Sequence, residues 1–259
     1  MSTVHVVDDR DRQALRLDDG WPRRWSAVWQ VDGSEVICAV RDMASFSLAR
    51  CEPVRRFSWR TNQRHRPGLE FLVSTGRHHG FESIAEQRLL LVLDFGGDLT
   101  SVLSQPMRLH FETDEGWRSH VPDFLAVTRT GRWLLDVRPG DRIGDDDRVK
   151  FAAAAEAALA CGWRYLVVTG WHRDALSTVE ALGAQRRPLT DLLGVQNELL
   201  EAVSRQPRPF AEVAGAASYP VVARAHLLHL LWRRRMGIDL GRPLTDRSMV
   251  WTATGGARR

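Results

Sequence analysis

The chain has 259 residues, of which 44% are apolar and 26% charged, with a formal net charge of +4. This length and composition exclude a disordered or fibrous chain and predict one large or two small domains. The longest apolar runs, such as 89–93, are far shorter than the ~20 residues that span a bilayer, and the first residues lack the pattern of a secretory leader. We therefore expect a cytoplasmic protein without a membrane segment.

Two features of the composition bear on function. The basic residues are almost all Arg, with Lys150 as the exception, and their modest excess permits nucleic-acid binding without requiring it. Cys38, Cys51 and Cys161 lack the paired spacing of a zinc site, which predicts reduced thiols.

The first quarter of the chain predicts a flexible arm over residues 1–20, followed by a β-rich extension over 21–75. The arm mixes acidic residues with Arg and shows little apolar periodicity. The extension contains short runs rich in Trp, Val and Phe, broken by Asp-Gly, Pro and Asn, which predict strands at 25–31, 35–40 and 57–60.

Residues 76–182 predict a mixed α/β core. Apolar residues at helical spacing follow Phe81, and Gly96-Gly97 ends that helix. Strands are then expected at 102–103, 107–111, 124–127 and 133–137, three or four of them in one sheet. The acidic residues 145–147 precede an alanine-rich helix over 149–160 that Gly162 ends, and a strand over 165–169 follows.

Residues 183–259 predict a small helical domain. Helices are expected at 189–203, 210–217 and 220–236, with a short tail over 238–250. This order is typical of a winged-helix-like unit.

Carboxylates fall at the ends of the predicted core elements. Glu86 lies on the first core helix, Asp123 starts one strand after Pro122, and Asp136 lies on the next strand. Arg138 is two residues beyond Asp136, so both side chains are expected on the same face of the strand. Carboxylates from neighbouring elements can hold Mg²⁺, which prefers oxygen ligands and keeps a water that can attack a phosphate.

These residues carry a family resemblance. Pro122-Asp123 followed by Asp136-Val137-Arg138 resembles the signature of the restriction-endonuclease-like fold, Pro-Asp and then acidic-x-Lys. Together with Glu86 and Gln105-Pro106, this order and spacing over about residues 55–180 resembles the TnsA-type transposon endonucleases. The implied fold is a restriction-endonuclease-like mixed sheet flanked by helices, with the extension and the helical domain added to it.

The resemblance also implies a function and partners. It aligns Glu86, Asp123 and Asp136 with the metal-binding carboxylates, with Mg²⁺ as the ion and Mn²⁺ as a substitute. It gives Gln105 a structural role. The implied partners are double-stranded DNA at transposon ends, a DDE-type transposase that cuts the other strand, and an ATPase regulator, and the implied role of the C-terminal domain is docking on such proteins.

The sequence departs from the family at Arg138, where the signature has Lys. Arg supplies positive charge but is bulkier and does not deprotonate. Three alternatives follow: Arg138 serves as the cation, Lys150 reaches the same phosphate from the following helix, or the site is inactive. Each acidic residue also has a purely structural explanation, as an exposed helix acid, a strand start or a surface ion pair.

Basic residues in two segments are candidates for binding DNA. Residues 55–79 contain six Arg and one Glu among aromatic and His residues, which is typical of a phosphate-tracking surface. Three more Arg end the predicted helix over 220–236, where the helix dipole also favours them. The candidates are Arg55, Arg56, Arg60, Arg64, Arg66, Arg77, Arg233, Arg234 and Arg235.

The sequence thus predicts a Mg²⁺-dependent endodeoxyribonuclease subunit of a heteromeric transposase. The alternatives are a catalytically inactive DNA-binding adaptor of the same fold and a stand-alone repair or restriction nuclease.

Overall fold

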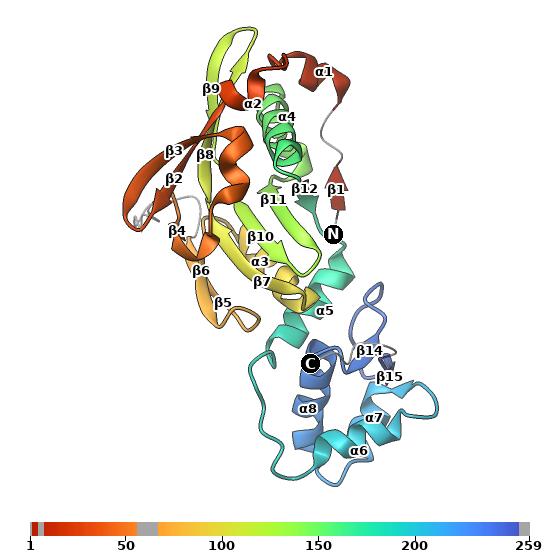
Figure 1. Cartoon of the computed structure of the whole chain (residues 1–259). Coiled ribbons are helices and arrows are strands. Elements are labelled where there is room, and N and C mark those ends of the chain that lie inside the picture. Colours follow the sequence, from red (N-terminus) through yellow and green to blue (C-terminus); the bar gives the residue numbers. More distant parts are fainter. Residues whose placement is uncertain (1, 5–7, 56–66, 254–259) are drawn as a thin grey trace. The chain divides into compact units, whose positions relative to one another are not determined.

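The computed structural model describes residues 2–4, 8–55 and 67–253. The chain is mixed α/β, with largely antiparallel sheets flanked by helices (Figure 1). It divides into two compact units, the first formed by residues 1–94 and 98–170, and the second by residues 95–97 and 171–259. In the described part of the chain, no helix is long and apolar enough to cross a membrane.

The first unit is built on a five-stranded sheet. Its strands, in spatial order, are β1 (Ser2–Val4), β12 (Arg164–Gly170), β11 (Gly131–Val137), β10 (Phe124–Thr128) and β7 (Leu99–Ser104). Only β11 and β12 are parallel, and helix α4 (Asp145–Ala160) makes the crossover between them. Helix α3 (Ile84–Gly96) precedes β7 and ends before Gly97 with φ 71°, as the sequence predicts.

A second sheet lies in the same unit. It has the order β3 (Ser34–Ala39), β2 (Ser26–Val31), β8 (Met107–Thr113) and β9 (Gly116–His120), with β4 (Cys51–Glu52) also paired to β2. The β2–β3 hairpin confirms two predicted strands, and Asp32-Gly33 turns it with positive φ at both residues. The third predicted strand, 57–60, lies outside the described residues.

Three of the four strands predicted over 102–137 share the main sheet, as β7, β10 and β11, whereas the strand predicted at 107–111 lies in the second sheet. Strand β8 pairs with β2 and β9 instead, and its alternate residues Met107, Leu109 and Phe111 are fully buried. A period-2 pattern fixes which residues of a strand face the core, but not which sheet receives the strand.

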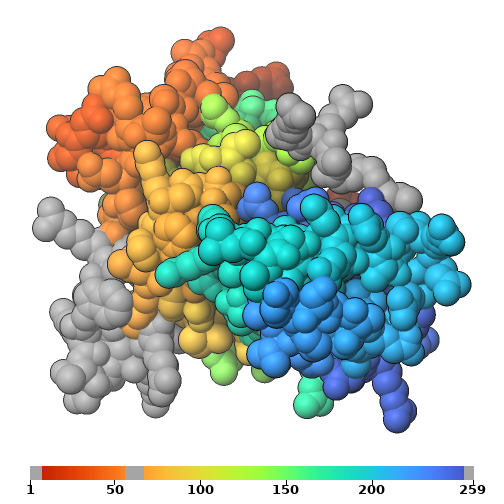
Figure 2. Space-filling view, turned by 90° about the horizontal axis from the view of Figure 1, so that it is seen from below, coloured from red at the N-terminus to blue at the C-terminus, as the bar shows by residue number. Residues whose placement is uncertain are grey.

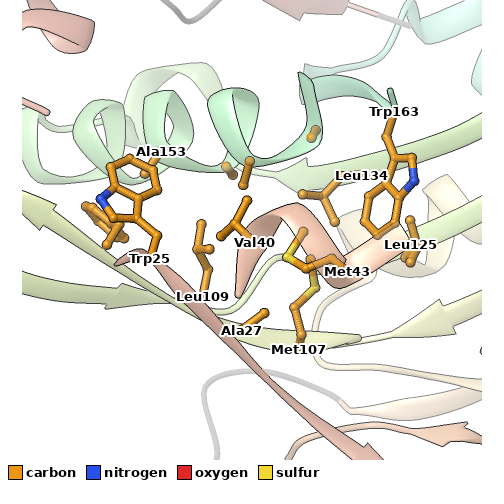
Figure 3. Close-up of a cluster of buried hydrophobic side chains, with 14 of the residues drawn as sticks. Trp25, Ala27, Val40, Met43, Met107, Leu109, Leu125, Leu134, Ala153 and Trp163 are labelled. Carbon is orange, nitrogen blue, oxygen red and sulfur yellow. The ribbon is translucent and has the colours of Figure 1, made fainter. Parts of the chain in front are cut away.

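The main core of this unit lies between the two sheets and α4 (Figure 3). Trp25 and Met43 enter it from the N-terminal extension, Leu125 and Leu134 from the main sheet, and alanines such as Ala153 from α4. The small alanine side chains let the helix lie close to this layer. The helix therefore holds the main sheet and the extension together in one core.

The N-terminal residues contribute to this core. Short helices α1 (Asp9–Gln13), α2 (Trp21–Arg24), η1 (Val40–Ser45) and η2 (Leu48–Arg50) connect its strands. Arg12 Nε lies 2.7 Å from the Glu156 carboxylate on α4, and Leu15 is buried. Residues 9–15 thus pack on the first unit instead of forming part of a loose arm.

Two further elements border the main sheet. Strands β5 (Gly68–Leu72) and β6 (Arg77–Phe81) form a hairpin next to β7, and turn η3 (Gly140–Arg142) precedes α4. The acidic residues 145–147 form the first turn of α4, and Gly144 is its N-cap. The Asp147 carboxylate accepts a hydrogen bond from the Gly144 N–H at 3.2 Å, so these acids stabilise the helix start.

The described residues of the second unit form four helices and a three-stranded antiparallel sheet. The helices are α5 (Arg173–Gly183), α6 (Val195–Ala202), α7 (Phe210–Gly215) and α8 (Pro220–Trp232), and the strands, in spatial order, are β13 (Arg208–Pro209), β15 (Met249–Thr252) and β14 (Met236–Ile238).

Helix α6 begins later than residue 189, where the sequence predicts a helix start. Gly194 has φ 73°, and the Asp191 carboxylate accepts hydrogen bonds from the N–H groups of Val195 and Gln196. Helix α5, which the sequence analysis did not predict, belongs to this unit, so the division falls at residue 170 and not at 182.

Candidate functional site

Two of the predicted carboxylates are cross-strand neighbours on the main sheet. Strands β10 and β11 pair Phe124 with Leu135, so continuing the register by one residue places Asp123 opposite Asp136. The Asp123 Oδ2 accepts a hydrogen bond of 2.7 Å from the Val137 N–H. Directly opposed residues on an antiparallel pair point to the same face. The strand spacing thus brings together two acids that are 13 residues apart in sequence.

The electrostatics show how close these acids are. Burial raises the pKa of Asp123 well above its usual value, and the negative charges of Asp136 and Glu86 raise it further. The hydrogen bond from Val137 opposes this shift only in part. Like charges that raise the pKa of one acid are typical of sites where carboxylates perform chemistry, although structural clusters show the same effect.

The third predicted carboxylate, Glu86, also has a structural role. It is buried on the first turn of α3, and its carboxylate accepts hydrogen bonds of 2.8 Å from the Glu82 N–H and from the Ser83 hydroxyl. The Ser83 hydroxyl in turn accepts a hydrogen bond from the Glu86 N–H. This Ser-x-x-Glu arrangement caps the helix and holds Glu86 near Asp123.

Two side chains that the sequence analysis did not select bind Asp136 directly. The Asp136 carboxylate is 3.0 Å and 3.1 Å from His120 Nε2, and it accepts a 2.7 Å hydrogen bond from the Tyr165 hydroxyl. The Asp136 residue is only 2% exposed, so these donors replace the water that a carboxylate otherwise needs. Burial and the Asp136 charge raise the pKa of Tyr165, which therefore stays a hydrogen-bond donor.

The fold explains both contacts, and a weak signal for them exists in the sequence. Strand β9 ends at His120, three residues before Asp123, and β12 runs parallel to β11 with Tyr165 opposite Leu134. Tyr165 therefore shares a face with Asp136, two residues along the neighbouring strand. The one signal that could have identified Tyr165 is a polar ring near the start of an apolar strand.

The two candidate cations both lie at the start of α4. The Arg138 guanidinium is 3.2 Å from the Asp147 carboxylate and donates a 3.3 Å hydrogen bond to the Arg142 carbonyl. The Lys150 ammonium pairs with Asp146, whose pKa this ion pair lowers. Arg138 is exposed, and its side chain contacts the first turn of α4, whereas Asp136 contacts His120 and Tyr165.

Gln105 joins the site from the end of β7. Its N–H donates a 2.7 Å hydrogen bond to the Asp123 carbonyl, and its φ of 46° lies in the left-handed region. The side-chain oxygen is buried without a hydrogen-bond partner among the described residues. Strain and an unpaired polar atom beside an acidic pair favour a functional position over a merely structural one.

The donor chemistry of these residues suits a hard cation, but their arrangement is not a finished metal site. Among the described residues, no three His, Cys, Asp or Glu side chains form a cluster that could hold a metal ion. In Glu86 and in Asp136, each of the two carboxylate oxygens already has a hydrogen bond to a protein donor. Among the described residues, the Asp123 carboxylate accepts one hydrogen bond, from the Val137 N–H, and it is therefore the acid most open to a further ligand.

The candidate DNA-binding arginines fall into three groups. Arg56, Arg60, Arg64 and Arg66 lie outside the described residues, whereas Arg55 and Arg77 are exposed on the first unit. Arg233 and Arg235 are exposed at the end of α8.

Arg234 differs from its two neighbours. It has φ 53° and donates a 2.7 Å hydrogen bond to the Phe95 carbonyl within the second unit. Its guanidinium packs so closely on Gly97 that a side chain there would collide with it. Arg234 is therefore a structural residue, and the three arginines do not form one basic face.

Comparison with known proteins gives no independent assignment. No protein-family model and no curated protein matches the sequence.

Proposed function

We propose that this chain is a metal-dependent DNA endonuclease subunit of a heteromeric transposase that hydrolyses a phosphodiester bond at transposon ends. The observation that carries the proposal is the cross-strand pair Asp123 and Asp136, with the charge of Glu86 acting on the same carboxyl group. These are the residues through which the sequence resembles the restriction-endonuclease-like fold. The proposal is also supported by the order of the elements, in which α3 precedes the sheet strand β7 and α4 connects β11 to β12.

In this proposal, the residues of the site have different roles. Asp123 would hold Mg²⁺ together with Asp136 and Glu86, and the ion would supply Lewis-acid chemistry at the phosphate. His120 and Tyr165 orient the Asp136 carboxylate through its two oxygens, and Glu86 is positioned by the α3 cap. Arg138 or Lys150 would supply positive charge to the phosphate after the ion pair of that side chain with an acid of α4 is broken.

The remaining parts of the proposal concern partners. The second unit, with its helices and three-stranded sheet, is proposed to be a winged-helix-like module that docks on DNA or on the other transposition proteins. A DDE-type transposase would cut the second strand, and an ATPase would regulate the complex. The whole assembly would act in the cytoplasm.

Metal binding tests the proposal without a partner or a DNA sequence. We expect calorimetric titration with Mn²⁺ to show binding to the wild type and none to Asp123→Ala, whereas Asp19→Ala, a change at an exposed acid outside the site, binds normally. Cleavage of plasmid DNA by the wild type with Mg²⁺ and a DDE-type transposase, and its loss in Asp123→Ala, would complete the test. Equal Mn²⁺ binding by the wild type and Asp123→Ala would contradict the proposal.

The inactive adaptor is a second candidate, and one observation favours it. Both candidate cations are paired with acids of α4, and the carboxylates are largely paired with protein donors. An adaptor binds DNA with equal affinity in the presence and absence of Mg²⁺ and never cleaves it. Metal-dependent cleavage by the wild type rules this candidate out.

A further inference from the structure

A polar cavity of about 500 Å³ lies along the outer edge of β7. Its floor is the last strand of the main sheet, residues 100–104, and its walls are the β5–β6 hairpin and the segment from η2 to β4. The hairpin, in the orange part of the colour scale, lies at the molecular surface (Figure 2). The volume is within the range of about 300–1,000 Å³ that is typical of ligand sites. The cavity is therefore large enough for a nucleotide-sized group.

The described lining of this cavity favours an anion. It contains Arg77, two His and several hydroxyl groups, and no acidic side chain is among the described residues that line it. Arg77 is exposed and forms no ion pair with the described residues, so its charge is available to a ligand. Ser101 likewise has a hydroxyl with no hydrogen-bond partner in the described part of the chain.

The neighbouring histidine is fixed by the fold. The His79 Nε2 is 2.8 Å from the Thr75 hydroxyl at the other end of the β5–β6 turn. Burial lowers the pKa of His79, so at neutral pH it adds no charge to the cavity. Arg77 is thus the fixed cation in the described lining, and His78, exposed with its ring against Phe71, is a second polar group beside it.

The cavity leads toward the carboxylate site. The Ser104 hydroxyl donates a 2.7 Å hydrogen bond to the Gly80 carbonyl, and both residues line the cavity. Ser104 pairs with Phe124, the residue after Asp123, and Gln105 binds the Asp123 carbonyl. The hairpin that forms the wall continues through Phe81 into the cap of Glu86. A strand bound in the cavity would therefore approach the acids without crossing another element of the sheet.

We infer that this cavity holds a nucleotide of the DNA strand next to the bond that is cut, with Arg77 and Ser101 binding its backbone phosphate. The inference rests on the proposed function, because it names where the substrate strand enters the same site. Arg suits a phosphate because its planar guanidinium can donate two parallel hydrogen bonds. A DNA backbone phosphate is favoured by the polar lining of the cavity, by the exposed charge of Arg77 and by the connection through Ser104 and Gln105 to Asp123.

Binding to labelled oligonucleotides tests the inference in EDTA, where no cleavage occurs. We expect Arg77→Ala to weaken binding about 5–10-fold and to reduce the slope of log K against log [salt] by about one, because one phosphate contact is lost. Ser101→Ala should weaken binding less, and Arg77→Lys should restore part of the loss. The matched control is Arg23→Ala, which removes an exposed Arg on α2 away from the cavity and should stay within twofold of the wild type.

The outcomes separate the inference from the proposed function. If Arg77→Ala and Arg23→Ala change affinity and salt slope equally while both keep the wild-type melting temperature, the inference is overturned. Arg77-dependent binding of inorganic phosphate or a mononucleotide, without any binding of the oligonucleotide, would also overturn it, because the cavity would then take a free anion. DNA binding that depends on Arg77 in a protein that never cleaves DNA contradicts the proposed function, and it leaves the cavity as a DNA-binding site of an inactive adaptor.

Discussion

Replacing Asp123 by Asn is expected to stabilise the protein at neutral and alkaline pH. Two carboxylates on opposed strand positions lie about 5 Å apart, and at an effective dielectric constant of about 20 their charges repel by about 3 kcal/mol. The Val137 hydrogen bond to Asp123 and the His120 and Tyr165 bonds to Asp136 offset part of this repulsion. We expect a net gain of about 1–2 kcal/mol, or about 3–6 °C in melting temperature for a unit of this size.

The gain should depend on pH in a defined direction. The folded pKa of Asp123 is raised, so the folded state holds its proton more tightly than the unfolded state does. The resulting stabilisation of the wild type is fully present below the unfolded pKa of about 3.9 and is lost as the pH rises through the folded pKa. The variant lacks this titration, so the difference in stability between the two proteins should be near zero at pH 4 and largest at pH 8.

Thermal unfolding of both proteins between pH 4 and pH 8 measures this difference. Other titrating groups are present in both proteins, so their contributions largely cancel. Asp19→Asn, which changes an exposed acid outside the site, should show no such pH-dependent gain. An Asp123→Asn variant that is less stable than the wild type at pH 8, or whose advantage does not change with pH, would refute the electrostatic reasoning.

Three further predictions concern other parts of the chain. Tyr165→Phe removes the hydroxyl that binds the buried carboxylate on β11, and chemical denaturation should show a loss of about 1.5–3 kcal/mol; an unchanged midpoint would mean that the hydrogen bond contributes nothing. Arg234→Ala should cost about 1–2 kcal/mol in the same assay, because a hydrogen bond to a backbone carbonyl is lost, whereas the exposed Arg233→Ala should be neutral. Burial raises the pKa of Cys38 and Cys161 to about 11. Iodoacetamide at pH 8 should therefore alkylate both thiols roughly 100-fold more slowly than an exposed thiol, and fast labelling would contradict the burial.

Local patterns predicted the elements whose signals lie within one segment. The apolar spacing after Phe81 and the glycines after it define α3, and the Asp32-Gly33 turn defines the β2–β3 hairpin. The partner of β8 was not predictable in this way, because pairing joins residues about 80 positions apart in the sequence. The delayed start of α6 depends on the Asp191 side chain and on Gly194, which a periodicity count over 189–203 does not weigh.

The residues of the site show the same difference between local patterns and long-range contacts. The sequence motif selected Asp123 and Asp136, and the strand register brings them together because both lie at ends of neighbouring strands. His120 reaches Asp136 only because the second sheet ends beside the first, and Tyr165 reaches it through a parallel register set by the α4 crossover. Neither contact follows from the spacing of residues along the chain. The carboxylates were predictable, and the donors that hold one of them were not.

The arrangement of the acids is itself an argument about function. The end of the β10–β11 pair that places Asp123 against Asp136, with the charge of Glu86 nearby, loses stability to charge repulsion. An Asn at 123 would keep the hydrogen bond to Val137 without that loss. Natural sequences depart from the most stable choice mainly where function requires it. The carboxylate of Glu86 stabilises the start of α3, and His120 and Tyr165 stabilise the buried carboxylate of Asp136. By contrast, no contact among the described residues gives Asp123 a stabilising role that needs its charge. The charge of Asp123 is therefore best explained by a ligand of opposite charge. For this reason, the comparison of Mn²⁺ binding by the wild type and Asp123→Ala decides between the nuclease and the inactive adaptor.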